Sequence, residues 1–476
     1  MMWLQTVPLI FLIVLFAISL VHSSKTSRLS ILVLGVIAIN FFCAVLLHLH
    51  PRSGHPFASL SAMLFFGVAY GMLSIPLLFI KRGREDVGID APCELSVRTY
   101  LTLSVVLIVL TLPVSIYDFY LGIRGLFSYA TSGMSREAYR RTHLITESGG
   151  ITEFCFFLES FSYCALFLSA VGVVHFPKFK KLGVLLLIGG LAPTFWSYST
   201  IARSGAFKSA LFYLMSVLIM ALPRLRKRRN IARVFLSPAI VVLLISSVIP
   251  FSVLTVIRFT SVFAPNEYKK TVQVAVEANT AEQEPKTVIV RGSNKEGLLY
   301  SSFSYFCTGA YSFNADYVVR YEKGLPSFSG VLTMGPVMKF VDLLSGGKRT
   351  KTATTLFEKL HSAAPDEWPR SLYSEVSGAY SGEFKTMIGY LCLDYPPWGV
   401  MLFCFVVALG AGLAFAFMRS GTLAYNLLQT IYCYTLVYGL MLWPWRSVRQ
   451  GLILFWLLGF VLLLWFLSSR NRKYGE

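Results

Sequence analysis

The side chains of this sequence that could do chemistry begin with an arginine set between two apolar stretches. Arg203 lies in the segment TFWSYSTIARSGAFKSALF, where a polar turn is followed by a glycine that permits an unusual backbone conformation. A cation at this depth is costly unless it meets a partner, so it is a functional hypothesis by default. The competing interpretation is that Arg203 extends to lipid phosphates and only anchors the turn.

More arginines lie outside the apolar stretches. A guanidinium stays charged at physiological pH and binds a phosphate through two parallel hydrogen bonds, which suits a diphosphate-linked lipid substrate. For any one of these arginines a solvated loop charge is the competing interpretation. The candidates are Arg140, Arg141, Arg258, Arg291, Arg320, Arg446 and Arg449.

A transfer reaction would also need a general base, a carboxylate or imidazole within hydrogen-bond reach of the attacking hydroxyl. Glu159 lies inside an apolar stretch, where we expect it to be buried and where it could simply bond a neighbouring helix. Asp394 precedes an apolar stretch and is expected to cap a helix. The sequence does not decide between the candidate acids, which are Asp118, Glu147, Glu153, Glu159, Asp316, Glu322, Glu375, Glu383 and Asp394.

The motifs of other chemistries are missing from the sequence. No HExxH, CxxC, Walker, GxGxxG or Gly-x-Ser-x-Gly pattern occurs, so nothing indicates zinc, a nucleotide or a serine nucleophile. We therefore expect no metal and no cofactor. The eight cysteines do not form a disulfide framework. His361 is the one histidine of the long polar segment and is expected at the surface.

The composition is that of a polytopic membrane protein. The chain has 476 residues, of which 55% are hydrophobic and only 14% charged. Its formal net charge of +19 comes largely from short connections between apolar stretches. Basic residues in that position set topology or contact anionic lipid headgroups, so we expect a lipid bilayer as partner and no nucleic acid.

The apolar stretches predict an all-α fold. A bilayer core of about 30 Å takes about 20 apolar residues as helix, and open strands cannot cross it, which gives about 11 transmembrane helices. The sixth and seventh, joined at Arg203, could instead form a hairpin that only dips into the membrane. The expected spans are 3–21, 30–48, 57–80, 99–117, 151–176, 182–200, 205–222, 234–257, 388–417, 423–442 and 451–468.

The basic connections predict the topology. Clusters at 25–28, 81–84, 178–181 and 224–233, together with the C-terminal tail, fall on one side if every span is real, and that side is cytoplasmic by the positive-inside rule. The other side then receives an arginine-bearing loop at 118–150 and one much larger loop. We expect three parts: an N-terminal bundle of about eight helices at 1–257, a large periplasmic loop at 258–387, and about three C-terminal helices at 388–476.

Three segments resemble, in order and spacing, the bacterial oligosaccharide repeat-unit polymerases, the O-antigen or Wzy-type polymerases. They read YSTIARSGAF, YSFNADYVVRYEKGLPSFSGVLTMGPVMKF and YSGEFKTMIGYLCLDYPPWGVMLF, and the resemblance covers about residues 195 to 413. Asp394 and Gly399 match the family's return segment, although DYPP replaces the usual Asp-Phe-Gly. The Arg-x10-Gly spacing of some members is missed by one residue between Arg320 and Gly330.

The resemblance implies a glycosyltransferase that joins undecaprenyl-diphosphate-linked oligosaccharides at the outer face of the bacterial inner membrane and releases undecaprenyl diphosphate. A chain-length regulator and a flippase are the implied partners. For this reaction the candidate catalytic residues are Arg203, Arg320, Asp394 and Glu159, and the candidate substrate-binding residues are Arg258, Arg140, Arg141, Arg446, Arg449, Tyr311 and Tyr317.

Other functions stay open on the residues alone. An O-antigen ligase would have a similar bundle and one large outer loop with arginine and histidine, for which His361 is available. A lipid-linked oligosaccharide flippase would favour internal repeats, and we find none. A receptor or scaffold with a sensor loop is the third alternative. The sequence does not specify the sugars, the linkage, retention or inversion, or whether the product is O-antigen, capsule or exopolysaccharide.

Overall fold

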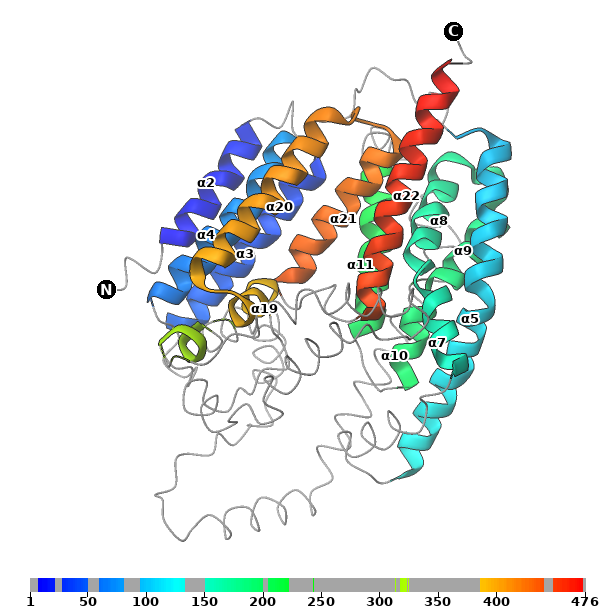
Figure 1. Ribbon diagram of the computed structural model, residues 1–476, viewed down its shortest axis with the longest axis horizontal. Coiled ribbons are helices and arrows are strands. Elements are labelled where there is room, and N and C mark those ends of the chain that lie inside the picture. Colours follow the sequence, from blue (N-terminus) through cyan, green and yellow to red (C-terminus); the bar gives the residue numbers. More distant parts are fainter. Residues whose placement is uncertain are drawn as a thin grey trace, which may run out of the picture.

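The computed structural model describes twelve parts of the chain, and its regular structure there is helical, with no strand in the described residues (Figure 1). The expected span 234–257 and the expected loop 258–387 lie mostly outside this described part. The described residues are 7–21, 28–49, 60–80, 95–132, 150–199, 204–221, 243, 313, 317–322, 324, 386–440 and 448–473.

One half of the bundle combines the first three described helices with two helices that come late in the chain (Figure 1). The helices α2 (Val7–Val21), α3 (Arg28–Leu49) and α4 (Leu60–Phe79) pack against one another. Helix α20 (Pro397–Phe417) lies along α4, and the short helix α19 (Met387–Asp394) precedes it. Residues more than 300 positions apart in the sequence therefore share one core.

The other half is built on a single long helix, α5 (Val97–Ser132), which packs against the next four helices. Helix α21 (Leu423–Gly439) connects the halves, because it contacts α3 on one side and α11 and α22 on the other. The remaining helices of this half are α7 (Gly150–Glu159), α8 (Ser162–His175), α9 (Lys180–Gly190), α10 (Ala192–Ser199), α11 (Ser204–Ala221) and α22 (Val448–Lys473).

Within the described residues, five helical segments are long and apolar enough to cross a membrane, or six if the bent pair α9 and α10 counts as one. This confirms an all-helical protein with several apolar helices of membrane-spanning length. The total of about 11 spans stays a prediction. The five segments are Ser61–Phe79, Val97–Tyr129, Phe157–His175, Pro397–Phe417 and Gly451–Ser469.

The outside of the bundle is apolar. Helix α20 exposes Leu402, Phe405 and Leu409 to about half of their full area, and Phe417 to 86%. Helix α22 likewise exposes Leu462 and other large apolar side chains. Exposing apolar area to water costs about 25 cal/mol per Å². Contact with the hydrocarbon tails of lipids removes that cost. These surfaces are suited to face lipid.

The expected outer loop at 118–150 is partly wrong, because α5 continues through Ser132. Phe119 of this segment packs on α10, where the Phe119 and Phe195 rings meet edge to face at 5.1 Å. A Cβ atom at Gly122 would lie 2.6 Å from the Phe195 carbonyl oxygen, so this glycine permits the close approach of the two helices. Packing, rather than hydropathy alone, extends the helix.

Three of the expected spans contain breaks. The span 151–176 consists of α7 and α8, which are separated at Ser160 and Phe161. The span 388–417 consists of α19 and α20, separated at Tyr395 and Pro396, because a residue before proline avoids the helical conformation and Tyr395 is extended at φ −125°, ψ 155°. The span 182–200 consists of α9 and α10, which bend by 43° at Leu191. The expected hairpin of the sixth and seventh spans stays a prediction, because its turn at Arg203 lies outside the described residues.

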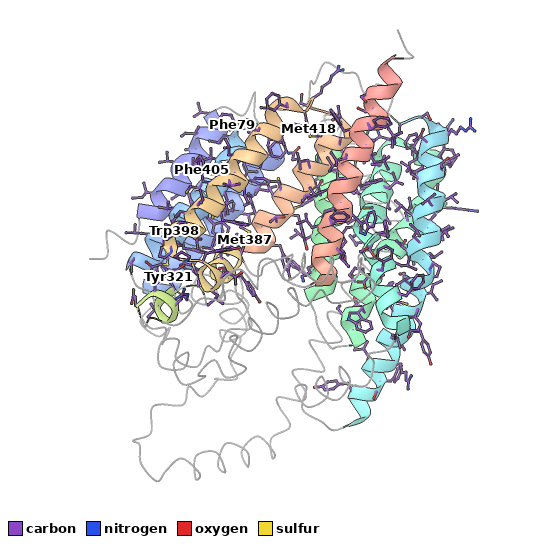
Figure 2. All side chains as sticks on the ribbon, viewed as in Figure 1. Phe79, Tyr321, Met387, Trp398, Phe405 and Met418 are labelled. Atoms are coloured by element: carbon purple, nitrogen blue, oxygen red, sulfur yellow. The ribbon has the colours of Figure 1, made fainter. Side chains whose placement is uncertain are left out.

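The two ends of the bundle differ in charge. Figure 2 places Phe79 and Met418 at one end and Tyr321 and Trp398 at the other. Arg419 follows Met418, and α22 ends at the same side on a basic segment whose last residue is Lys473 (Figure 1). We call this the basic end, and we call the opposite one the η3 end after the π-helical turn η3 (Val318–Glu322) that lies there.

Candidate functional site

Aromatic rings gather at the η3 end, where η3 meets the start of α4. Phe313 stacks on Phe66 with 4.6 Å between ring centroids. The Tyr317 ring lies 5.4 Å from that of Phe65 and 5.0 Å from that of Tyr321. Tyr317 and Tyr321 combine an apolar ring with a polar hydroxyl, so this cluster offers stacking faces and hydrogen bonds together.

Arg320 is presented beside these rings by η3. Its guanidinium carbon lies 5.7 Å from the centroid of the Tyr321 ring, within the range of a cation–π interaction. Ser61 of α4 donates a hydrogen bond of 3.2 Å from Oγ to Oε1 of Glu322, which ties the turn to the bundle. Turns of the π type are uncommon and occur frequently at functional sites. The guanidinium is half-buried and held on a fixed element.

Helix α19 closes the other side of this site. The Tyr321 hydroxyl donates a hydrogen bond of 2.7 Å to the carbonyl oxygen of Tyr395, which follows Asp394. Asp394 is 1% exposed and is the last residue of α19. Thr386 caps the start of the same helix, because its Oγ1 accepts a 3.0 Å bond from the Gly389 N–H. The structure thus brings Arg320, Tyr317 and Asp394, all predicted site residues, onto adjoining elements.

The predicted role of Asp394 as a helix cap is wrong. It ends α19 instead of starting α20, whose N-cap is Pro396 without any side-chain cap bond. A proline at this position has its φ already fixed and suits the chain just before a helix. The buried carboxyl group of Asp394 therefore has no capping role for α20, and it stays a candidate for the site.

The two phenols of the site are held neutral. Burial raises the pKa of Tyr321 well above its ordinary value; the neighbouring Cys392 adds to the rise, and Arg320 opposes it. Burial likewise raises the pKa of Tyr317, against a hydrogen bond with Ser61. At cellular pH both hydroxyls therefore donate and accept hydrogen bonds, and neither acts as a base.

Glu159 lies in the other half of the bundle, at the end of α7, and is separated from η3 by α21 in Figure 1. It is fully buried, as predicted. Arg449 lies in the first turn of α22, of which the backbone is described. The other predicted site residues lie outside the described residues; these are Arg203, Arg258, Arg140, Arg141, Arg446 and Tyr311.

Sequence reasoning missed a buried lysine. Lys208 of α11 is 6% exposed, and its Nζ lies 5.3 Å from the centroid of the Tyr438 ring of α21. The signal was present, because Lys208 is the one charged residue of the helix SGAFKSALFYLMSVLIMA. The rule that an intramembrane charge is a functional hypothesis applies to Lys208 as much as to Arg203.

The described residues contain no group of three or more His, Cys, Asp or Glu side chains that could hold a metal ion. Comparison with known proteins finds no protein-family model, no curated protein and no solved structure that matches the chain. The function is therefore argued from the geometry of the η3 end and from the membrane-facing surface of the bundle.

Proposed function

We propose that this protein is a membrane glycosyltransferase that polymerises oligosaccharide repeat units carried on undecaprenyl diphosphate, at the outer face of the bacterial inner membrane. The observation that carries the proposal is the Arg320 site. A guanidinium and two neutral phenols lie together at the end of lipid-suited helices, and a buried acid lies on the adjoining helix α19. A lipid-linked sugar has a matching sequence of parts: a hydrocarbon tail, a diphosphate and sugar rings.

Each part of the substrate has a proposed partner. The polyprenyl tail lies along the exposed apolar face of α20. Arg320 binds the diphosphate at the level where lipid headgroups begin, because a guanidinium accommodates phosphate oxygens through paired hydrogen bonds. Tyr317 and Tyr321 contact the sugars with their rings and hydroxyls. Trp398, 71% exposed at the start of α20, suits the same headgroup level, where tryptophan is enriched.

The orientation of the site supports this proposal. The positive-inside rule assigns the basic end to the cytoplasm, which puts the η3 end on the periplasmic side. The long polar segment 258–387 returns to the bundle through Thr386 and α19 at the η3 end (Figure 1). By the same rule we propose that segment 258–387 is periplasmic and takes part in holding the growing saccharide.

The test is a gel ladder of the surface polysaccharide from a deletion strain that carries wild-type protein, Arg320→Ala or Arg98→Ala. Arg98 is an exposed arginine at the start of α5 and serves as the matched control. The deletion is expected to leave only the single-repeat band, and Arg98→Ala, but not Arg320→Ala, is expected to restore the ladder at normal protein level.

Two outcomes would contradict the proposed function, and a third would contradict only the role of Arg320. Loss of the single-repeat band in the deletion strain would indicate a flippase. Accumulation of long lipid-linked polymer would indicate a ligase. A full ladder from Arg320→Ala would remove Arg320 from the site while leaving the polymerase assignment in place.

A further inference from the structure

Glu322, the last residue of η3, is the one exposed acid among the acidic side chains that the structure describes. The others are buried: Asp118 is 2% exposed, Asp394 1% and Glu159 0%. A general base must come within hydrogen-bond reach of the substrate hydroxyl from which it takes a proton. A carboxylate inside the bundle could do so only if the bundle opened. Accessibility therefore favours Glu322 among these acids.

The Glu322 carboxylate lies close to two hydroxyl groups. Ser61 donates a hydrogen bond of 3.2 Å to its Oε1 atom. The pKa of Tyr317 is raised by burial and, to a smaller extent, by the nearby Cys392 and Glu322 groups, so the carboxylate is near this phenol as well. A carboxylate has about four lone-pair positions on its two oxygens. It can therefore hold these neighbours and still accept a hydrogen bond from a substrate hydroxyl.

A row of contacts leads from Glu322 to Arg320. The Tyr317 ring lies 5.0 Å from the Tyr321 ring, and the centroid of the Tyr321 ring lies 5.7 Å from the guanidinium carbon of Arg320. Glu322 and Arg320 are two positions apart on η3, and side chains two apart on a helical turn do not face each other. In the order of these contacts, the two phenols come between the cation and the carboxylate.

This order is the one that a direct sugar transfer requires. The diphosphate leaves from one side of the anomeric carbon, and a base that activates the attacking hydroxyl acts from the opposite face of the sugar ring. The cation and the base must therefore be separated by the width of a sugar, with sugar-binding groups between them. Tyr317 and Tyr321 combine rings and hydroxyls and suit that middle position.

We infer that Glu322 is the catalytic base of the transferase and contacts the acceptor sugar. This inference rests on the proposed function and deepens it. Arg320 holds the donor diphosphate, the phenol pair contacts the donor sugar, and Glu322 accepts a hydrogen bond from the acceptor hydroxyl. The buried carboxyl group of Asp394 takes no part in the proton transfer.

The transfer step balances with these residues. The acceptor hydroxyl gives its proton to the Glu322 carboxylate while its oxygen bonds to the anomeric carbon. The bond from that carbon to the diphosphate oxygen breaks, and its electron pair stays on the oxygen. Arg320 stabilises the negative charge that develops there. The products are the extended saccharide and a polyprenyl diphosphate, and the exposed Glu322 carboxyl group returns its proton to water.

Two variants separate the base from the contact that ties η3 to the bundle. Glu322→Gln removes the basic carboxylate but keeps an oxygen that can accept the hydrogen bond from Ser61. Ser61→Ala removes that bond but keeps the carboxylate. Asp394→Asn is the third variant and tests the buried acid on α19.

The test uses the full-length protein in nanodiscs of neutral phospholipid, with lipid-linked repeat units extracted from the deletion strain as substrate and undecaprenyl diphosphate as the binding probe. Glu322→Gln is expected to retain undecaprenyl diphosphate binding and to lower the polymerisation rate by about 100-fold or more. Ser61→Ala is expected to lower thermal stability and to slow polymerisation by less than about tenfold, because it removes one hydrogen bond.

A Glu322 that only anchors η3 predicts the reverse pattern. Ser61→Ala would then lose as much rate as Glu322→Gln, and that result would overturn the inference. A wild-type rate from Glu322→Gln would also overturn it, and a loss confined to Asp394→Asn would move the proton transfer to that acid. If the deletion abolishes the ladder but Glu322→Gln restores it fully, the proposed function stands and this base does not. If the deletion leaves a full ladder, the proposed function itself fails.

Discussion

The hydroxyl and the ring of Tyr321 have separate roles in the Arg320 site. The hydroxyl donates to the Tyr395 carbonyl oxygen at 2.7 Å, and the ring lies under the guanidinium. The hydroxyl thus joins η3 to α19, and the ring positions the cation. Because the phenol is kept neutral, its bond to a carbonyl oxygen persists across the physiological pH range.

At high pH this tyrosine is expected to weaken the fold. Its pKa is raised in the folded state, so above about pH 10 the unfolded chain releases the phenol proton while the folded chain still holds it. Stability from this group is present below the unfolded pKa and falls as pH rises above it. Tyr321→Phe is expected to lose about 1 kcal/mol at pH 7 and to show a shallower decline above pH 10. Thermal unfolding in detergent from pH 7 to 11 measures both, and an unchanged alkaline slope would contradict the assignment.

The sequence could predict a property of a single residue only where the neighbouring residues in the sequence determine that property. The burial of Glu159 followed from its apolar neighbours. Arg320 and Asp394 were candidates from their residue types alone, and their roles stay predictions. Lys208 also carried a local signal, a lone charge in an apolar helix, and was overlooked. The partners of these residues, such as Tyr395 for Tyr321 across 74 positions, depend on tertiary packing that no short segment encodes.

At the scale of elements, close helix contacts explain where the structure departs from hydropathy. Gly122 allows α5 to lie against the backbone of α10. The Pro396–Pro397 pair divides one apolar stretch into α19 and α20, and this break was readable from the sequence. The bend between α9 and α10 was hard to predict, because a hydropathy sum counts apolar residues and does not report the direction of the helix axis.

Replacing either of two helical glycines by alanine is therefore expected to change stability, but in opposite directions. At Gly122 an added Cβ atom would lie 2.6 Å from a backbone oxygen, which cannot move aside, so Gly122→Ala is expected to destabilise by about 1–3 kcal/mol. At Gly410 of α20 nothing lies within 4 Å, so Gly410→Ala is expected to gain about 0.5–1 kcal/mol from helix propensity. Thermal unfolding of both variants in one detergent measures the difference. Equal shifts would show that α5 and α10 are not in close contact.

For the whole molecule, composition predicted the helical membrane class, because apolar content is summed over all residues and does not depend on which residues are in contact. It could not predict that α20 packs on α4, or that α21 joins two halves built from distant segments. These pairings place the Arg320 site and the buried Lys208 on opposite sides of α21 (Figure 1). The orientation of the Arg320 site toward the η3 end is the property on which the proposed periplasmic reaction depends.

That orientation is open to a direct experiment. Glu322 is exposed at the η3 end, and Arg419 is exposed in the turn between α20 and α21 at the basic end. In a cysteine-free background, a membrane-impermeant thiol reagent added to cells with a permeabilised outer membrane is expected to label Glu322→Cys and not Arg419→Cys. Breaking the inner membrane is expected to make Arg419→Cys reactive as well. The reverse order would place the η3 end in the cytoplasm, where the positive-inside rule and a periplasmic polymerase would both be contradicted.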